Sequence, residues 1–280
     1  MGKIPNHLHF IFGLAPQTRP FHIVHYLCLE SCWQVNQPDQ MNLYCAHEPF
    51  GPWWEKIKPR LTLKKIEPEM FITDNPRYSQ TQEGRFIQQH QLEYAHQADF
   101  LRLKILLEHG GIYADLDTLF LQPLPEDLYH QSFVLGAEAP VRLGASEQWE
   151  DSLCNALIMS EPEAAFGAQW LANMYQVFDG TWSRHSCLEA GRLSKMMPET
   201  LHICPQHFFY KHPSTPEGIQ TLLLGRDYDY AGMYSLHLWA HLWWDKRRRD
   251  FSSFHAGLFT EAFIRTVDTT YTLAARRFLP

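Results

Sequence analysis

One unit of the sequence constrains the fold more than any other: a helical run that ends in two glycines and passes directly into an apolar strand. Apolar residues recur at spacings of three and four, which predicts a helix over residues 83–109. Gly110 and Gly111 follow, and glycine commonly ends helices. Residues 112–121, IYADLDTLFL, then predict a buried strand. A helix joined so closely to a strand is typical of α/β proteins.

The remaining elements extend this α/β pattern. The predicted strands are residues 4–13, 41–45, 133–136 and 153–159, and the predicted helices are residues 21–33, 52–58 and 163–178. The helix over 52–58 carries an exposed-looking pair, Trp53 and Trp54, and is expected to stop at Pro59. A polar stretch over 74–82 predicts a long loop over a site. Because the sequence has no repeat and no Gly/Ser linker, we expect one domain over residues 1–280.

Composition limits the functions open to the chain. Its 280 residues carry a formal net charge of −7, so a basic face for nucleic acids is not expected. The six cysteines form no CxxC pair, which favours reduced thiols and a cytoplasmic location. Neither a signal peptide nor a membrane-spanning run is evident. The basic run from Lys246 to Arg249 is either a solvated turn or a weak peripheral contact with an anionic membrane.

Two aspartates, Asp115 and Asp117, stand two residues apart near the carboxyl end of the predicted strand. If the strand continues through them, both carboxylates lie on one face, and ligands of open α/β sheets bind at that end. Buried carboxylates need a neutralising cation, and oxygen ligands suit Mn²⁺ or Mg²⁺. A bare Asp-x-Asp is more often an ordinary turn, so the motif alone leaves both interpretations open.

Asp99 and Arg102 lie three residues apart on the preceding helix. They could form a surface ion pair that contributes little to stability. They could instead lie beside the strand of Asp115, where a carboxylate and a guanidinium can orient the hydroxyl groups of a sugar. Spacing alone does not choose between the two.

The segment from Ala95 to Asp117 resembles the signature of the glycosyltransferases that have a DXD sugar-binding region, a family that includes initiating α-mannosyltransferases and, more distantly, clostridial glucosylating toxins. The shared positions are Asp99, Arg102, Gly110, Gly111, Tyr113, Asp115 and Asp117. The resemblance implies a GT-A type fold, a mixed and mostly parallel sheet flanked by helices. It also implies transfer of a sugar, with retention, from a UDP-sugar or GDP-mannose to a glycan, glycolipid or protein acceptor, with Mn²⁺ or Mg²⁺ as cofactor.

The same resemblance implies roles around a metal and diphosphate centre. Asp115 and Asp117 would hold the ion as catalytic residues, with His241 as a further ligand where relatives carry a small polar residue. Trp243 would approach the diphosphate, and Tyr113 would lie at the same centre.

On the substrate side, Asp99 and Arg102 would hold the sugar hydroxyls as further catalytic residues. Asn155 would lie near the sugar, and His237 matches a substrate-binding position of relatives. Phe12 stands at the end of the first strand, where relatives place an aromatic residue near the nucleotide base.

Two other functions remain as alternatives. The strand and its aspartates superficially resemble a haloacid-dehalogenase-like phosphatase, but Leu119 stands where that family needs Thr or Val. A non-catalytic sugar-binding module would use the many aromatic rings, although it would not need a site that neutralises a diphosphate.

Overall fold

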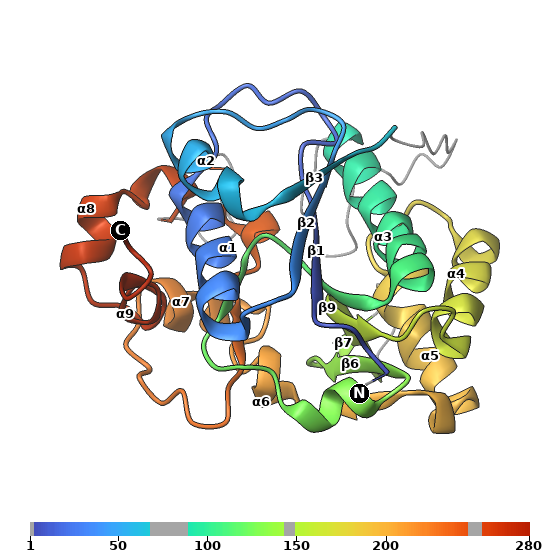
Figure 1. Ribbon diagram of the computed structural model, residues 1–280. Helices are drawn as coiled ribbons and strands as arrows, with labels where there is room; N and C mark the ends of the chain where they lie inside the picture. Colours follow the sequence, from blue (N-terminus) through green and yellow to red (C-terminus); the bar gives the residue numbers. More distant parts are fainter. Residues whose placement is uncertain (1–2, 68–88, 143–148, 246–253) are drawn as a thin grey trace.

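The fold is built on a mixed α/β sheet. The computed structural model describes residues 3–67, 89–142, 149–245 and 254–280. Within them a seven-stranded sheet has the order β10-β6-β9-β4-β1-β2-β3 (Figure 1). Its strands are β1 (His7–Ile11), β2 (Gln40–Cys45), β3 (Thr62–Lys65), β4 (Gly111–Ala114), β6 (Phe133–Ala137), β9 (Leu153–Ser160) and β10 (His202–Cys204). Only β9 in this sheet runs antiparallel to its neighbours, β4 and β6. The expected mixed and mostly parallel sheet is therefore confirmed.

Helices cover both faces of the sheet. In Figure 1, α1 and α2 lie on the side of the carboxyl-terminal helices, whereas α3, α4 and α5 lie on the opposite side. The helices are α1 (Ile23–Asn36), α2 (Pro52–Ile57), α3 (Gln89–His109), α4 (Ala165–Val177), α5 (Glu189–Met196), α6 (Gln206–Phe209), α7 (Pro216–Leu223), α8 (Glu261–Thr266) and α9 (Thr270–Arg276). Along β1, Leu8 and Phe10 join one apolar cluster and Ile11 joins the other, because successive strand residues point to opposite faces. The core is therefore split into two layers by the sheet.

The single strand expected over residues 112–121 is wrong. The chain forms β4, turns through Asp115 to Asp117, and then forms β5 (Thr118–Phe120), which pairs antiparallel with β11 (Ser235–His237) in a separate sheet. The Thr118 amide donates to the Asp115 carbonyl at 3.0 Å, which closes the turn. The two aspartates therefore lie in a turn where the chain passes from one sheet to another, and not on one face of a strand.

Other predictions need smaller corrections. The pair expected to be exposed is not: Trp54 is fully buried and Trp53 is half-buried against the core. The helix α2 ends at Ile57, before Pro59, as expected, and a separate 3₁₀ turn (Lys58–Arg60) follows it with Pro59 near its start. The predicted loop over 74–82 and the basic run from Lys246 to Arg249 lie outside the described residues, as do residues 83–88 of the predicted helix.

The carboxyl-terminal half contains elements that hydrophobic periodicity does not reveal. A single π-helical turn (Arg184–Leu188) leads into α5, and a 3₁₀ turn (Ala240–Leu242) follows β11. A short pair of strands, β7 (Val141–Arg142) and β8 (Trp149–Glu150), stands apart from the main sheet. Elements of two to five residues are too short to show a period.

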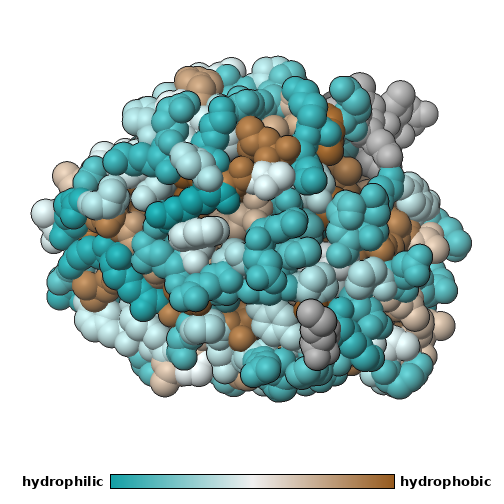
Figure 2. Space-filling view, in the orientation of Figure 1, coloured by the Kyte–Doolittle hydropathy of each residue, from teal (hydrophilic) through white to brown (hydrophobic). Residues whose placement is uncertain are grey.

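The visible surface is mixed in character. Figure 2 shows hydrophilic side chains over most of this face, with apolar side chains in separate patches among them. In the part of the chain that the structure describes, every helix is too short or too polar to cross a bilayer.

Candidate active site

The site is built around the turn between β4 and β5. The Asp115 amide donates to the Ala156 carbonyl of β9 at 2.8 Å, so the start of the turn is fixed to the main sheet. Its end is fixed to the segment after β11: the Ala240 amide donates to Asp117 Oδ2 at 2.7 Å, and the Leu238 amide donates to the Asp117 carbonyl at 2.9 Å. Segments more than 100 residues apart in sequence thus meet at this turn.

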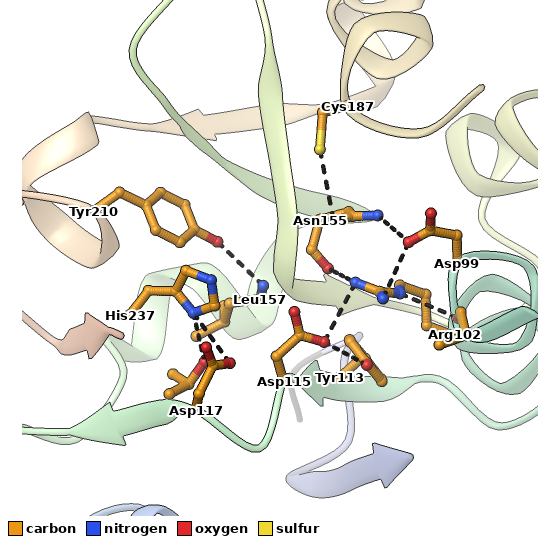
Figure 3. Close-up of polar contacts among 12 residues, drawn as sticks. Asp99, Arg102, Tyr113, Asp115, Asp117, Asn155, Leu157, Cys187, Tyr210 and His237 are labelled. Atoms are coloured by element: carbon orange, nitrogen blue, oxygen red, sulfur yellow. Dashed lines mark hydrogen bonds and ion pairs between the residues drawn. The ribbon is translucent and has the colours of Figure 1, made fainter. Parts of the chain in front are cut away.

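Three side chains at this turn could hold a divalent metal ion. Asp115, Asp117 and His237 each offer one ligand atom, and these atoms lie within 4.8 Å of one another. Figure 3 shows His237 pointing at Asp117 from β11, with Nδ1 3.6 Å from Asp117 Oδ1. Two carboxylates and an imidazole suit Mn²⁺, and the carboxylates also suit Mg²⁺. The residues present therefore fit the expected cofactor.

His241, expected as a metal ligand, is not in this group of three. Its ring lies against that of Trp182, with centroids 4.9 Å apart, and it is half-buried. His237, expected on the substrate side, stands in the group instead, because β11 places it directly opposite Thr118, the residue after Asp117. His237 and His241 lie four residues apart in a segment rich in aromatic residues. The sequence alone did not show which of the two histidines faces the aspartates.

The surroundings of Asp115 disfavour an isolated negative charge. Burial is the main cause that raises the pKa of Asp115, and the nearby charge of Asp117 raises it further. Arg102 opposes this effect, with Nη1 3.5 Å from Asp115 Oδ1. The Tyr113 hydroxyl donates to the same oxygen at 2.6 Å. A bound cation would relieve the remaining repulsion between the two aspartates.

Arg102 connects the turn to helix α3 and strand β9. It is only 5% exposed, and its guanidinium contacts Asp99 Oδ1 at 3.1 Å and donates to the Asn155 carbonyl at 2.7 Å. It also lies over the Tyr113 ring, 4.5 Å from the centroid. Burial would lower the pKa of Arg102, but Asp115, Tyr113 and Asp99 outweigh it and raise the pKa. The pair with Asp99 is therefore a buried ion pair and not an exposed one.

Asp99 is fixed by three donors. Besides Arg102, Asn155 Nδ2 donates to Oδ1 at 2.7 Å and His185 Nε2 lies 3.0 Å from Oδ2. Burial alone would raise the pKa of Asp99, but Arg102 and the hydrogen bond from His185 outweigh it and hold the pKa below its usual value. His185 was missed in the sequence because it comes from the π-helical turn, which carries no periodic signal. Its neighbour Cys187 donates to Asn155 Oδ1 at 3.5 Å.

Phe12 packs against His25, and His25 in turn contacts the turn between β4 and β5. The sequence had not identified His25 as part of the site. The Phe12 ring is half-buried and packs against Phe21 and His25, at centroid distances of 5.2 and 5.1 Å. His25 Nδ1 lies 3.1 Å from the Leu116 carbonyl, in the middle of the turn. The His25 ring also stacks on Trp244, with centroids 4.6 Å apart.

Trp243 lies in the core behind the turn. It is fully buried, and its indole N–H donates to the Leu238 carbonyl. Its ring packs against Phe254 and Phe259, at centroid distances of 5.7 and 5.4 Å. In this structure Trp243 therefore contacts the segment that holds Asp117, and its ring faces the apolar interior.

Comparison with known proteins points to one family. Residues 32–134 match the model described as "Glycosyltransferase sugar-binding region containing DXD motif". Over 250 residues the chain is 30% identical to "Glucan organizing enzyme 1" of Cryptococcus neoformans var. grubii, covering 85% of this chain and 63% of that protein. It is 34% identical over 100 residues to "Subversion of eukaryotic traffic protein A" of Legionella pneumophila, covering 35% of this chain and 13% of that protein. The chain thus spans less than two thirds of the length of either curated relative.

Solved structures with a similar arrangement are also glycosyltransferases by their titles. The galactosyltransferase LgtC, in complex with donor and acceptor sugar analogs, has 12% identity and a TM-score of 0.46 and covers 97% of this chain and 95% of its own. The glycosyltransferase GlyE of Streptococcus pneumoniae TIGR4 has 11% identity and a TM-score of 0.48 and covers 98% of this chain and 63% of its own. The family resemblance expected from the segment around Asp115 and Asp117 is confirmed by the matching family model and the curated relative: the chain carries, in residues 32–134, the DXD-containing sugar-binding region of the glycosyltransferases.

Proposed function

We propose that this chain is a metal-dependent glycosyltransferase that moves a sugar from a nucleotide diphosphate sugar to a hydroxyl-bearing acceptor. The observation that carries the proposal is the group of Asp115, Asp117 and His237, whose two aspartates belong to a DXD-containing sugar-binding region. A site that gathers a half-buried carboxylate, a buried carboxylate and a buried imidazole is suited to a cation that neutralises a diphosphate.

In this proposal the three residues of that group hold Mn²⁺ or Mg²⁺, and His237 takes the ligand position first expected for His241. When bound, the ion would neutralise the charge that develops on the nucleotide diphosphate as it leaves. Trp243 would act indirectly, from the core side of the turn. Its indole N–H donates to the Leu238 carbonyl, and the Leu238 amide donates to the Asp117 carbonyl. Its contribution is to fix the turn.

Asp99 and Arg102 would orient the sugar of the donor. Most of the hydrogen-bonding positions of Asp99 and Arg102 are already occupied by other protein groups. The lone pairs of Asp99 and the N–H groups of Arg102 that remain therefore point in fixed directions. Fixed donors and acceptors bind a sugar in one orientation, and orientation lowers the barrier to transfer. Asn155 completes this arrangement, while Phe12 would lie on the nucleotide side.

The finer features follow from the family resemblance. We propose that transfer retains the anomeric configuration, that the donor is a UDP-sugar or GDP-mannose, and that the acceptor is a glycan, a glycolipid or a protein. A cytoplasmic location with a weak membrane contact through the run from Lys246 to Arg249 belongs to the same proposal. Loss of co-sedimentation with anionic vesicles after neutral substitution of that run would support the contact, and co-sedimentation that is insensitive to the substitution would exclude it.

Calorimetric titration of UDP and GDP, with and without Mn²⁺, tests the proposal. We expect nucleotide binding that requires Mn²⁺ and that Asp117→Asn abolishes without loss of the folded state. Asp245→Asn, a change of the same kind at an exposed position, is the matched control and is expected to bind like the wild type. Metal-independent binding, or full binding by Asp117→Asn, would contradict the metal site.

The same protein preparations separate the alternatives. A sugar-binding module would bind saccharides and show no Mn²⁺-dependent nucleotide binding. A phosphatase would release phosphate from a generic aryl phosphate, and the glycosyltransferase proposal expects no such release.

A further inference from the structure

Trp239 has a backbone conformation that bulky residues rarely adopt. It follows β11 with φ +53° and ψ +44°, in the left-handed region. Two other described residues besides glycines have a positive φ: Gln37 at the end of α1 and Glu163 just before α4. Both lie at helix boundaries, whereas Trp239 lies two residues after His237. A left-handed conformation is costly for a large side chain and persists only where its surroundings hold it, most often at a functional site.

The left-handed bend turns two amides onto the same aspartate. The Leu238 amide donates to the Asp117 carbonyl at 2.9 Å, which continues the pairing of β11 with β5. In an extended strand the Ala240 amide would lie about 7 Å further along the chain. Instead it donates to Asp117 Oδ2 at 2.7 Å. Trp239, the residue between the two amides, therefore makes the bend that returns the chain to Asp117.

The side chain of Trp239 supports the third potential metal ligand. Trp239 is 5% exposed, and its ring meets the His237 ring in a T-shaped contact, with centroids 4.3 Å apart. The indole N–H donates to the His212 carbonyl at 2.8 Å. The Tyr210 ring lies 5.9 Å from both rings, and its hydroxyl accepts from the Leu157 amide of β9 at 3.1 Å (Figure 3). His237 thus packs against two rings that are themselves hydrogen-bonded to the backbone.

Packing matters here because the polar contacts of the His237 ring are long. Nδ1 lies 3.5 Å from Thr118 Oγ1 and 3.6 Å from Asp117 Oδ1. Contacts of this length orient a ring only weakly, so the contact with Trp239 carries more of the orientation. The Ala240 amide occupies Asp117 Oδ2, which leaves Oδ1 as the oxygen that faces His237.

We propose that Trp239 is a positioning residue for the metal centre; this rests on the proposed function. Its ring orients His237, and its left-handed backbone brings the Ala240 amide to Asp117. Trp239 therefore acts on two of the three ligand residues without being a ligand. Loss of Trp239 weakens metal binding although every ligand atom is still present.

The test is titration with Mn²⁺, followed by electron paramagnetic resonance of the free ion, with and without UDP or GDP. We expect Trp239→Leu to weaken Mn²⁺ binding about a hundredfold. Trp239→Phe keeps a ring but loses the indole N–H, and we expect about a tenfold loss; these values span the range for groups that orient metal ligands.

A further variant separates the backbone from the ring. Asparagine is close to leucine in size but tolerates the left-handed conformation. Trp239→Asn should therefore bind Mn²⁺ about tenfold more tightly than Trp239→Leu, within the same range. Equal affinities of these two variants would overturn the role of the backbone.

Trp170→Leu is the matched control. Trp170 is 1% exposed, and its indole N–H also donates to a backbone carbonyl, that of His185 at 3.3 Å. It belongs, however, to the other apolar cluster of the core. We expect Trp170→Leu to lose stability in urea unfolding, as Trp239→Leu does, but to keep the wild-type affinity for Mn²⁺.

The remaining outcomes separate the inference from the proposed function. Wild-type Mn²⁺ affinity in Trp239→Leu, or in Trp239→Phe if the leucine variant does not fold, would overturn the inference. An equal loss of affinity in Trp170→Leu would also overturn it, because Trp239 would then act only through stability. A wild-type protein that binds no Mn²⁺, with or without nucleotide, would overturn the proposed function itself.

Discussion

At the scale of single residues, the site depends on charges that compensate one another away from water. Arg102 faces both Asp99 and Asp115, and each of these carboxylates has at least one further donor. The sequence identified the three charged residues through the family pattern. It did not identify His185 or His25, because a lone histidine carries no signal until the fold brings it to its partners.

Loss of Arg102 should therefore affect stability as well as activity. Arg102→Ala would leave the buried Asp99 and the half-buried Asp115 without their cation, and we expect a loss of about 3–5 kcal/mol in the free energy of unfolding, mainly from Asp99. Urea unfolding measures it. The control is Arg184→Ala, whose side chain is 59% exposed in its pair with Asp179 and should cost about 1 kcal/mol or less. Similar losses in the two variants would contradict the buried network.

At the scale of elements, prediction succeeded where a segment was long and periodic. Helices α1, α3 and α4 and strands β1, β2, β6 and β9 were expected close to their observed bounds. The break between β4 and β5 was missed because local pattern cannot show that residues 118–120 pair with residues 235–237. Short elements after Gly180 were missed for the same reason: long-range contacts, and not local periodicity, stabilise them.

The glycine pair that ends α3 has different requirements at its two positions, and Gly111 is the more constrained. Its φ is +105°, and an added Cβ would lie 2.5 Å from the His7 carbonyl oxygen. We expect Gly111→Ala to cost more than about 2 kcal/mol in urea unfolding, because left-handed strain adds to a backbone clash.

Gly232→Ala is the matched control for that experiment. Gly232 also has a positive φ, +70°, but the nearest atoms to its added Cβ are 3.7 Å away. Only the strain of the backbone remains, so we expect a cost of about 1 kcal/mol. Equal losses at the two glycines would show that the contact with β1 does not matter.

At the scale of the whole molecule, buried neutral histidines tie stability to pH. Burial is the main cause that lowers the pKa of His9 and of His96 to about 4. Between that value and their unfolded value of 6.5, the unfolded chain binds more protons than the folded one, so stability is full above 6.5 and falls as the pH falls.

We expect each of these two histidines to contribute a loss of up to about 1.4 kcal/mol per pH unit across that interval. Urea unfolding at pH 7, 6 and 5 measures the slope. His9→Asn should reduce the slope, whatever it does to the absolute stability. A wild-type slope of zero between pH 6 and 5 would contradict the prediction.

The tie between Asp117 and the segment after β11 has a consequence for the order of events during synthesis. A chain that has emerged as far as residue 200 already contains β1, β4, β9 and both aspartates, but not His237, Leu238 or Ala240. Domains generally fold as units, and β10 of the main sheet is also still missing at that length. A chain that ends at residue 200 therefore carries both aspartates without the backbone donors that fix Asp117, and the turn is completed only when the last quarter of the chain docks.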